Sequence, residues 1–172
     1  MRNKTLVFKI FFELLLVAVF LAFDLLTKEL IYGQVIKSGN DIVVIDGIIS
    51  FTHAENTGAA WSIFSGETLY LGIFSLVLSV VFFIALLCLT NFRYKSIRFS
   101  LTLILGGALG NCFDRLHLGY VRDFVELTFM NYPIFNFADS ELVIGLSLLL
   151  FAIIFLYKPF TPVKNEKKTA LL

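Results

Sequence analysis

The sequence predicts an all-α membrane protein with four transmembrane helices and a small β-hairpin, or cradle, outside the membrane. Two observations support this fold class. Of the 172 residues, 58% are hydrophobic and only 16% are charged, whereas about a quarter of the residues in a typical soluble domain are charged. In addition, four separate stretches approach the length of about 20 predominantly apolar residues that a helix needs to cross a bilayer.

The four predicted spans cover residues 10–32, 69–90, 99–116 and 137–157. The first span follows a basic segment, as the apolar core of a signal peptide does. Its apolar run is too long for a signal peptide, however, and no small-residue cleavage site follows it, so we expect an uncleaved helix. Because the sequence contains no internal repeat and no low-complexity segment, we expect residues 1–172 to form a single membrane domain.

The distribution of basic residues predicts the orientation of these helices, since cytoplasmic segments carry an excess of lysine and arginine. Basic residues gather in the N-terminal tail, in the link between the second and third spans, and in the C-terminal tail: Arg2, Lys4, Lys9, Arg93, Lys95, Arg98, Lys158, Lys164, Lys167 and Lys168. The link at 33–68 contains only Lys37. We therefore expect both termini in the cytoplasm and the links at 33–68 and 117–136 on the outer side.

The first outer link contains a pattern that is typical of a β-hairpin. Apolar residues 42–45 and the segment 48–51 flank Asp46 and Gly47, a pair that favours a tight two-residue turn. The second outer link is rich in aromatic residues, and we expect a short strand or an interfacial segment there.

Ionisable residues inside the spans are the most informative positions, because they are costly in a bilayer and usually mark function. Asp24 and Lys28 lie four residues apart on one face of the first span. They either neutralise each other at the helix end, with Lys28 reaching out to the membrane surface, or belong to a buried polar site. Glu13, close to Lys9, is expected to be an interfacial charge.

Polar residues also gather where the third span ends and the fourth begins. Asn111 and Arg115 share a helix face, and Asp114 lies beside them; they form either a locally bonded helix end or a cluster aimed across the bundle. Gly106 and Gly110 form a stripe that permits close helix packing. In the last span Asn136 and Asp139 have the spacing of a capping box, which is an alternative to a catalytic role. Asp123, next to Arg122, would by itself be interpreted as a solvated loop residue.

In the predicted topology eight polar residues lie at the outer end of the molecule, which predicts a functional site at the outer membrane surface. They are Asp24, Asn56, Asn111, Asp114, Arg115, Asp123, Asn136 and Asp139. The net charge of +1 argues against nucleic-acid binding. The sequence has no Cys/His cluster with metal-ligand spacing, no zinc-protease His-Glu-x-x-His motif and no Gly-x-Ser-x-Gly motif, so we expect neither a metal nor another cofactor. A small transporter and a non-enzymatic assembly factor remain as alternatives to an enzyme.

Four separated motifs resemble the signal peptidase II (lipoprotein signal peptidase) family. They are DLLTK at 24–28, NTGAAW at 56–61, GNCFDR at 110–115 with VRDF at 121–124, and FNFADS at 135–140. Each motif is weak alone, but their order on a four-span chain of this length is specific. The resemblance covers roughly residues 10–157. The sequence departs modestly from the family pattern: Trp61 stands where phenylalanine is common, Glu141 adds a charge beside Asp139, and the link between Asp123 and Asp139 is short.

The resemblance implies an aspartyl endopeptidase of the bacterial cytoplasmic (inner) membrane. Such an enzyme removes the signal peptide from diacylglyceryl-modified prolipoproteins by cutting on the N-terminal side of the lipidated cysteine. It implies that Asp123 and Asp139 are the catalytic pair. It also implies a substrate-binding or supporting shell made of Asp24, Lys28, Asn56, Gly58, Asn111, Asp114, Arg115 and Asn136. The expected partners are the prolipoprotein substrate and membrane lipids, and we expect the enzyme to be a monomer.

Overall fold

The computed structural model describes residues 2–59, 63–89 and 94–156, with side chains from residue 6 onward. Trp61, Arg93 and the basic residues of both tails lie outside the described side chains, apart from Lys9. Four helices are long and apolar enough to cross a membrane: Leu6–Ser38, Thr68–Cys88, Lys95–Leu118 and Phe137–Leu156. These helices and a three-stranded antiparallel sheet at one end confirm the predicted fold class.

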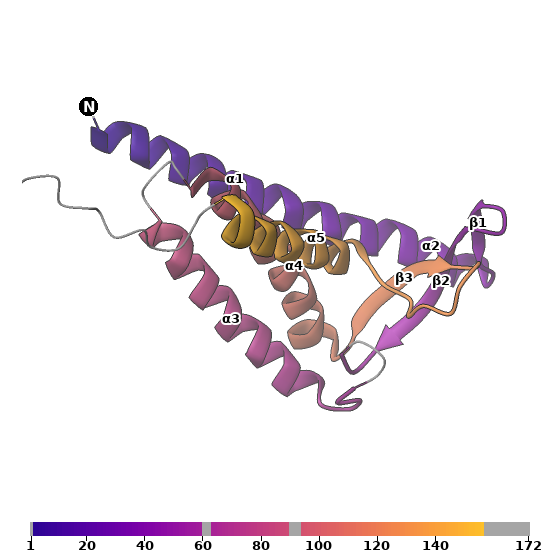
Figure 1. The fold of residues 1–172 in the computed structure, drawn as a ribbon. Coiled ribbons are helices and arrows are strands. Elements are labelled where there is room, and N and C mark those ends of the chain that lie inside the picture. Colours follow the sequence, from indigo (N-terminus) through magenta and orange to yellow (C-terminus); the bar gives the residue numbers. More distant parts are fainter. Residues whose placement is uncertain (1, 60–62, 90–93, 157–172) are drawn as a thin grey trace, which may run out of the picture.

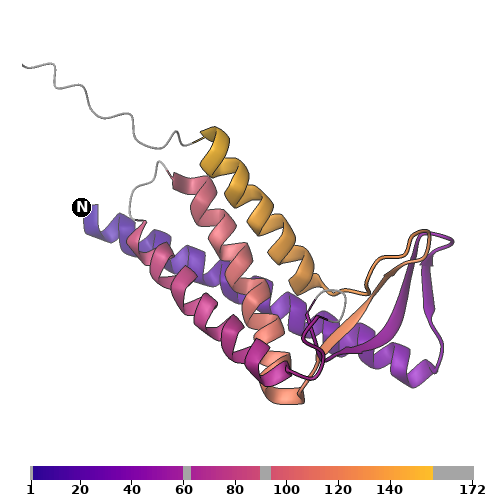
Figure 2. The same cartoon turned by 60° about the horizontal axis from the view of Figure 1, so that its bottom comes forward.

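The first span is a long rod that passes beyond the other helices to the sheet (Figures 1 and 2). It consists of α1 (Arg2–Thr27), a π-helical segment (Lys28–Tyr32) and α2 (Gly33–Ser38). A π-helical turn is uncommon and is found most often at functional sites. Here it begins at Lys28, and it turns the side chains of Lys28 and Tyr32 into the protein, where both are buried.

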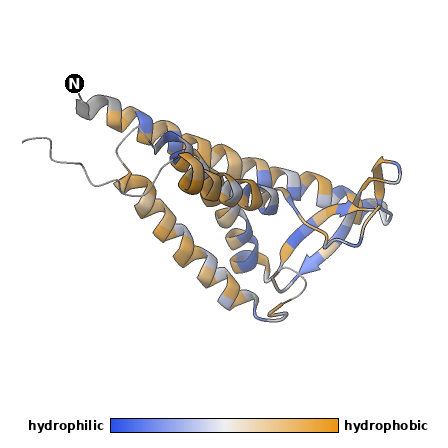
Figure 3. Ribbon diagram, in the orientation of Figure 1, coloured by the Kyte–Doolittle hydropathy of each residue, from blue (hydrophilic) through white to orange (hydrophobic). Residues whose placement is uncertain are grey.

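The third span, α4 (Lys95–Leu118), lies at the centre of the bundle. It packs against α1, α3 (Thr68–Cys88) and α5 (Phe137–Phe151), which a second π-helical segment (Ala152–Leu156) extends. Most of α4 is buried by its neighbours, whereas the other three helices expose most of their apolar surface. In Figure 3 the ribbons of α3 and α5 are mostly orange, the hydrophobic colour, as helices that face lipid require.

The sheet orders its strands β1-β2-β3 and confirms the predicted hairpin. β1 (Ile42–Ile45) pairs with β2 (Ile49–Asn56), and the turn between them has Gly47 at a φ of 68°. The aromatic-rich link forms β3 (Val121–Leu127), which pairs with β2 and follows α4 after a left-handed turn at Gly119. The sheet thus brings the polar ends of β2 and β3 over the C-terminal end of α4 and the N-terminal end of α5 (Figure 2).

Candidate active site

Asp139 is held at the first turn of α5 by a capping box. The side chain of Asn136 accepts a hydrogen bond from the Asp139 backbone N–H (3.0 Å), and one carboxylate oxygen of Asp139 accepts from the Asn136 backbone N–H (3.1 Å). The other carboxylate oxygen accepts from the Asn111 amide at 2.7 Å. The sequence left a capping box and a site role as alternatives, and the geometry shows that the capping box itself holds the Asp139 carboxylate against Asn111.

Asp123 lies on β3, where it pairs with Ala54 of β2 and is only 2% exposed. Its two carboxylate oxygens accept hydrogen bonds from the side-chain amides of Asn136 (2.6 Å) and Asn56 (3.0 Å). Burial and the neighbouring charge of Asp139 raise the pKa of Asp123 to about 7, although the two amide donors partly oppose this shift. Asp123 is therefore not the solvated loop residue that its local sequence suggested.

A fully buried lysine joins this pair to the helix bundle. The Lys28 amine lies 2.8 Å from the Asp24 carboxylate and 3.4 Å from that of Asp114. It also donates to the side-chain oxygen of Asn111 at 2.9 Å. This contact fixes the orientation of the Asn111 amide, since the oxygen faces Lys28 and the NH₂ group faces Asp139. The alternative in which Lys28 reaches out to the membrane surface is wrong.

Close helix packing makes room for this buried charge. The Asp24 carboxylate accepts a hydrogen bond from the Ala138 backbone N–H at 2.9 Å, which joins α1 to the start of α5. A Cβ atom on Gly110 would overlap the Asp24 carboxylate, and one on Gly106 would overlap the Cβ of Phe20 on α1. The predicted small-residue stripe of α4 is thus used for packing, and its outer member also clears space for the polar cluster.

Two arginines lie at the edge of the cluster. Arg122 binds both carboxylate oxygens of Asp114 and so fastens the start of β3 to the end of α4. Arg115 donates to the Gly58 carbonyl at 2.9 Å, and the Gly58 N–H donates in turn to Asn56. The buried Nε of Arg115 has no hydrogen-bond partner within the described part of the chain, and this side chain lines the central pocket.

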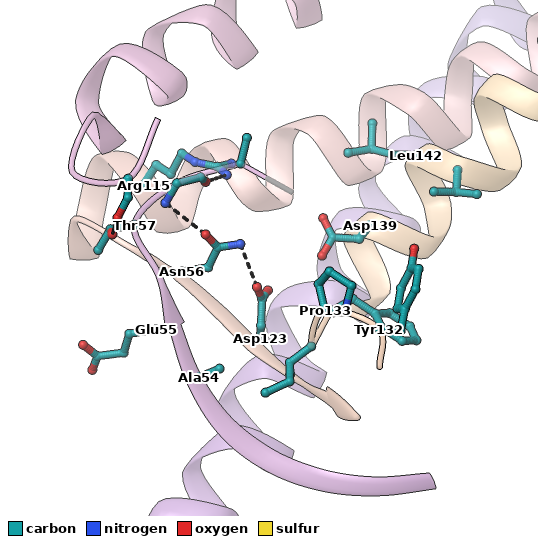
Figure 4. A pocket seen from close by; sticks show the side chains of 16 residues that line it. Ala54, Glu55, Asn56, Thr57, Arg115, Asp123, Tyr132, Pro133, Asp139 and Leu142 are labelled. Carbon is teal, nitrogen blue, oxygen red and sulfur yellow. Dashed lines mark hydrogen bonds between the residues drawn. The ribbon is translucent and has the colours of Figure 1, made fainter. Parts of the chain in front are cut away.

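The pocket has a volume of about 500 Å³ and is lined on one side by Asp123, Asp139 and Arg115. Figure 4 shows both aspartates pointing into it, one from the sheet and one from α5. Its other walls come from β2, from the loop before α5 and from the lipid side of α5, where Leu142 and Val143 are apolar. The pocket therefore offers two adjacent carboxyl groups to a chain that enters between the sheet and the membrane helices.

All ten candidate residues from the sequence meet in one hydrogen-bonded network. The network comprises Asp24, Lys28, Asn56, Gly58, Asn111, Asp114, Arg115, Asp123, Asn136 and Asp139. Arg122 was not among the predicted site residues, because an arginine beside an aspartate in a loop is usually solvated. The position of Arg122 next to Asp123 in the sequence could have drawn attention to it, but its guanidinium bonds to Asp114 instead of Asp123. Glu141, the added charge of the sequence, is buried near Gly106 and is not part of this network.

Polar groups deeper in the bundle do not extend this network. Ser79, Ser100 and Thr102 donate to backbone carbonyls of their own helices. Glu13, which was expected to be an interfacial charge, instead pairs with Arg98 at the other end of the molecule. Within residues 2–59, 63–89 and 94–156 no group of three His, Cys, Asp or Glu side chains is arranged to hold a metal ion.

Comparisons with known proteins identify the family of this chain. Residues 16–155 match the family model described as Signal peptidase (SPase) II. The chain is 46% identical over 114 residues to a lipoprotein signal peptidase of Enterococcus faecalis, covering 65% of this chain and 69% of the relative. It is 42% identical over 139 residues to one of Trichormus variabilis, covering 79% and 86%.

A solved structure described as a bacterial membrane enzyme is similar in both fold and sequence. It superposes with a TM-score of 0.69 at 32% identity and covers 83% of this chain and 92% of that protein. A second bacterial membrane enzyme structure gives the same TM-score at 29% identity, covering 81% and 85%. The matched segment contains every residue of the polar network, and the chain belongs to the signal peptidase II family of aspartic peptidases.

Proposed function

We propose that this membrane peptidase removes the signal peptide from diacylglyceryl-modified bacterial prolipoproteins, cutting on the N-terminal side of the lipidated cysteine. Lipoprotein signal peptidase is the activity of its relatives. The observation that carries the proposal is the convergence of Asp123 and Asp139 on one pocket that opens beside apolar helix surface. A substrate with a signal helix and acyl chains would bury its apolar parts on that surface while its polypeptide backbone reached the carboxyl pair.

We propose that the two carboxyl groups share one proton. Two adjacent carboxylates do not both ionise readily in a buried site. Asp123 is assigned as the protonated member, because its pKa is raised to about 7. Asp139 is assigned as the carboxylate, because it accepts hydrogen bonds from Asn111 and from the Asn136 backbone at a helix N-terminus, which favours negative charge.

In the proposed reaction Asp139 removes a proton from a water molecule as the water oxygen attacks the scissile carbonyl carbon. Asp123 donates its proton to the carbonyl oxygen, which gives a neutral tetrahedral diol. When the C–N bond breaks, Asp139 returns its proton to the leaving nitrogen and Asp123 recovers a proton from the diol. The products are a signal peptide with a free carboxyl group and a lipoprotein with a free amine on its cysteine.

The surrounding residues are assigned to positioning and binding. Asn56, Asn111 and Asn136 hold the two carboxyl groups, while Lys28, Asp24 and Asp114 hold Asn111 and the helix ends. Arg115 and Gly58 border the pocket and are assigned to the substrate backbone. No step of this scheme requires a metal or a cofactor. Because one chain supplies the whole network, we propose that the enzyme acts as a monomer.

The proposed orientation follows the basic residues. We place both termini in the cytoplasm and the sheet, with the pocket, at the extracytoplasmic face of the cytoplasmic membrane, because Lys37 is the only lysine or arginine at 33–68. The alternative of an ion path receives no support from the deeper serines and threonines, since those that the structure describes bond to their own helices.

The experiment that tests the proposed function compares two precursors of identical sequence, one diacylglyceryl-modified and one unmodified, with purified protein in lipid vesicles. We expect cleavage of the modified precursor immediately before the cysteine and only slow cleavage of the unmodified one, because the acyl chains contribute binding. Mass spectrometry of the products identifies the cut. Asp46→Asn, at the exposed turn of the hairpin, is the control and should cleave normally. Equal rates on both precursors would contradict the assigned substrate.

A further inference from the structure

Arg115 is the only basic residue that lines the catalytic pocket within the part of the chain that the structure describes. It lies in the last turn of α4, and its Nη2 group donates to the Gly58 carbonyl at 2.9 Å. The buried Nε of the same guanidinium has no hydrogen-bond partner among the described residues. Because a buried donor without a partner costs free energy, this side chain is suited to a ligand that brings a further acceptor into the pocket.

A chain of three hydrogen bonds joins Arg115 to Asp123 (dashed lines in Figure 4). The Gly58 carbonyl accepts from Arg115, and the Gly58 backbone N–H donates to the side-chain oxygen of Asn56 at 2.9 Å. The Asn56 amide then donates to Asp123 at 3.0 Å. No salt bridge among the described residues joins Arg115 to Asp123 or Asp139, although the charges of both aspartates act on it. The guanidinium therefore lies beside the carboxyl pair without direct contact to either carboxylate.

Cleavage changes the group that this guanidinium faces. The scissile carbonyl of the precursor is neutral, whereas the signal peptide ends in a carboxylate once the C–N bond has broken. A guanidinium binds a carboxylate more strongly than a neutral carbonyl, because both partners are charged and the planar fork can bind both oxygens. Asp139 repels the new charge, but its own carboxylate already accepts hydrogen bonds from Asn111 and from the Asn136 backbone. We therefore expect the attraction to Arg115 to prevail.

We propose that Arg115 binds the new C-terminal carboxylate of the cleaved signal peptide, so that the enzyme retains this product and is inhibited by it. The ligand class is an apolar peptide that ends in a free carboxylate. Its apolar side chains lie against Leu142 and Val143, which form the apolar wall of the same pocket. The identity of the peptide rests on the proposed function, which this inference deepens, since departure of the signal peptide then slows each round of turnover.

The test measures binding of two synthetic peptides to the purified full-length protein in lipid vesicles, after subtraction of their partition into protein-free vesicles. Both peptides carry the signal sequence of a precursor up to the cleavage position, and one ends in a carboxylate while the other ends in a carboxamide. We expect the carboxylate peptide to bind about tenfold more tightly. In the cleavage assay it should be the stronger inhibitor by the same factor.

Variants of the cation identify the residue responsible. In Arg115→Gln the two affinities should become equal, through loss of affinity for the carboxylate peptide alone. Arg115→Lys keeps the charge without the planar fork and should recover part of the preference. Lys37→Gln, which removes an exposed cation outside the pocket lining, is the matched control and should keep the full preference. Retained binding of the carboxamide peptide shows that a variant is folded.

Equal affinities of the two peptides for the wild-type protein would overturn the proposal, and this comparison needs no variant. Full preference for the carboxylate in Arg115→Gln would overturn it as well. Normal cleavage of the modified precursor with no preference between the peptides would leave the proposed function intact and remove only this inference. A preference for the carboxylate without any cleavage would contradict the proposed function but not the carboxylate site.

Discussion

The helices α1 and α4 bury charged groups at both ends of their interface, and the two ends differ in how the charges balance. At the end opposite the sheet, named the inner end after the proposed orientation, Glu13 faces Arg98, and the guanidinium also donates to the Leu86 carbonyl at 3.1 Å. At the outer end the single buried amine of Lys28 lies between the carboxylates of Asp24 and Asp114. The inner end is therefore matched one to one, whereas the outer end has an excess of acid.

The excess of carboxyl groups at the outer end is larger when Asp123 and Asp139 are counted. Both are also at least partly buried, and their hydrogen bonds come mainly from neutral amides. Arg122 compensates Asp114 from the edge of the cluster, and Arg115 lies at the pocket. In a matched ion pair the carboxylate stays ionised, whereas carboxyl groups that lie close together favour retaining a shared proton. The comparison indicates that the inner pair joins two helices, whereas the outer cluster has the excess of carboxyl groups that the proposed proton transfer requires, at the expense of stability.

Replacing the outer amine should have the largest effect. In Lys28→Met, Asp24 and Asp114 lose their shared buried cation, and Asn111 loses the contact that orients it toward Asp139. We expect a loss of about 3–5 kcal/mol in the free energy of unfolding and a large loss of cleavage rate. Denaturant unfolding in micelles and a cleavage assay measure the two effects. Lys37→Met, which is exposed, is the control, and near-normal stability of Lys28→Met would refute the role of the amine.

Breaking the inner pair should destabilise the protein without a direct effect on chemistry. Arg98→Met leaves the Glu13 carboxylate without its buried partner, which should cost about 3 kcal/mol. Adding Glu13→Gln removes the isolated charge and should recover much of that loss. The folded fraction of each variant should cleave at the wild-type rate. If the double variant were less stable than Arg98→Met, or if Arg98→Met cleaved slowly when fully folded, the two ends would not differ as described.

A stability gain from removing an active-site carboxyl should be the smallest effect. The pKa of Asp123 is about 7 in the folded protein, compared with the ordinary value of 3.8 in the unfolded chain. The folded state therefore binds the proton more tightly, and wild-type stability falls as the pH rises from about 4 to about 7. Asp123→Asn removes this dependence, which corresponds to about 4 kcal/mol at about 1.4 kcal/mol per pKa unit. The new amide also sets an NH₂ group against one of the two amide donors, which costs about 1–3 kcal/mol. The net gain in stability at about pH 8 should therefore be roughly 2 kcal/mol. Thermal unfolding at low and high pH measures it, and a destabilised variant at high pH would contradict the assignment.

Much of the fold was predictable, because the bilayer imposes length and apolarity on every span and the hairpin has a strong turn signal at Asp46 and Gly47. The ten site residues were identified through spaced motifs and the cost of intramembrane charge. What local pattern alone could not decide was the environment of each residue. Asp123 has an ordinary loop sequence, and its burial comes from β2 and α5, which are distant in the chain.

The missed interactions have the same origin. Glu13 and Arg98 are 85 residues apart, so no helical spacing connects them. Arg98 was placed in a basic cytoplasmic link because α4 begins at Lys95, one turn earlier than the apolar run suggests. A polar first turn lowers the apparent hydrophobicity of a helix without shortening it. The same reasoning explains why α2 extends the first span beyond its apolar part to Ser38.

The central claim is that Asp123 and Asp139 share one proton and use it to hydrolyse the peptide bond. Single-turnover cleavage by wild type, Asp123→Asn and Asp139→Asn, with binding of the modified precursor measured in parallel, tests it most directly. We expect the wild-type rate to fall as the pH rises past about 7, where Asp123 loses its proton. Both variants should bind the precursor but cleave it at least about 10³-fold more slowly at every pH. Wild-type turnover by either variant would contradict the account.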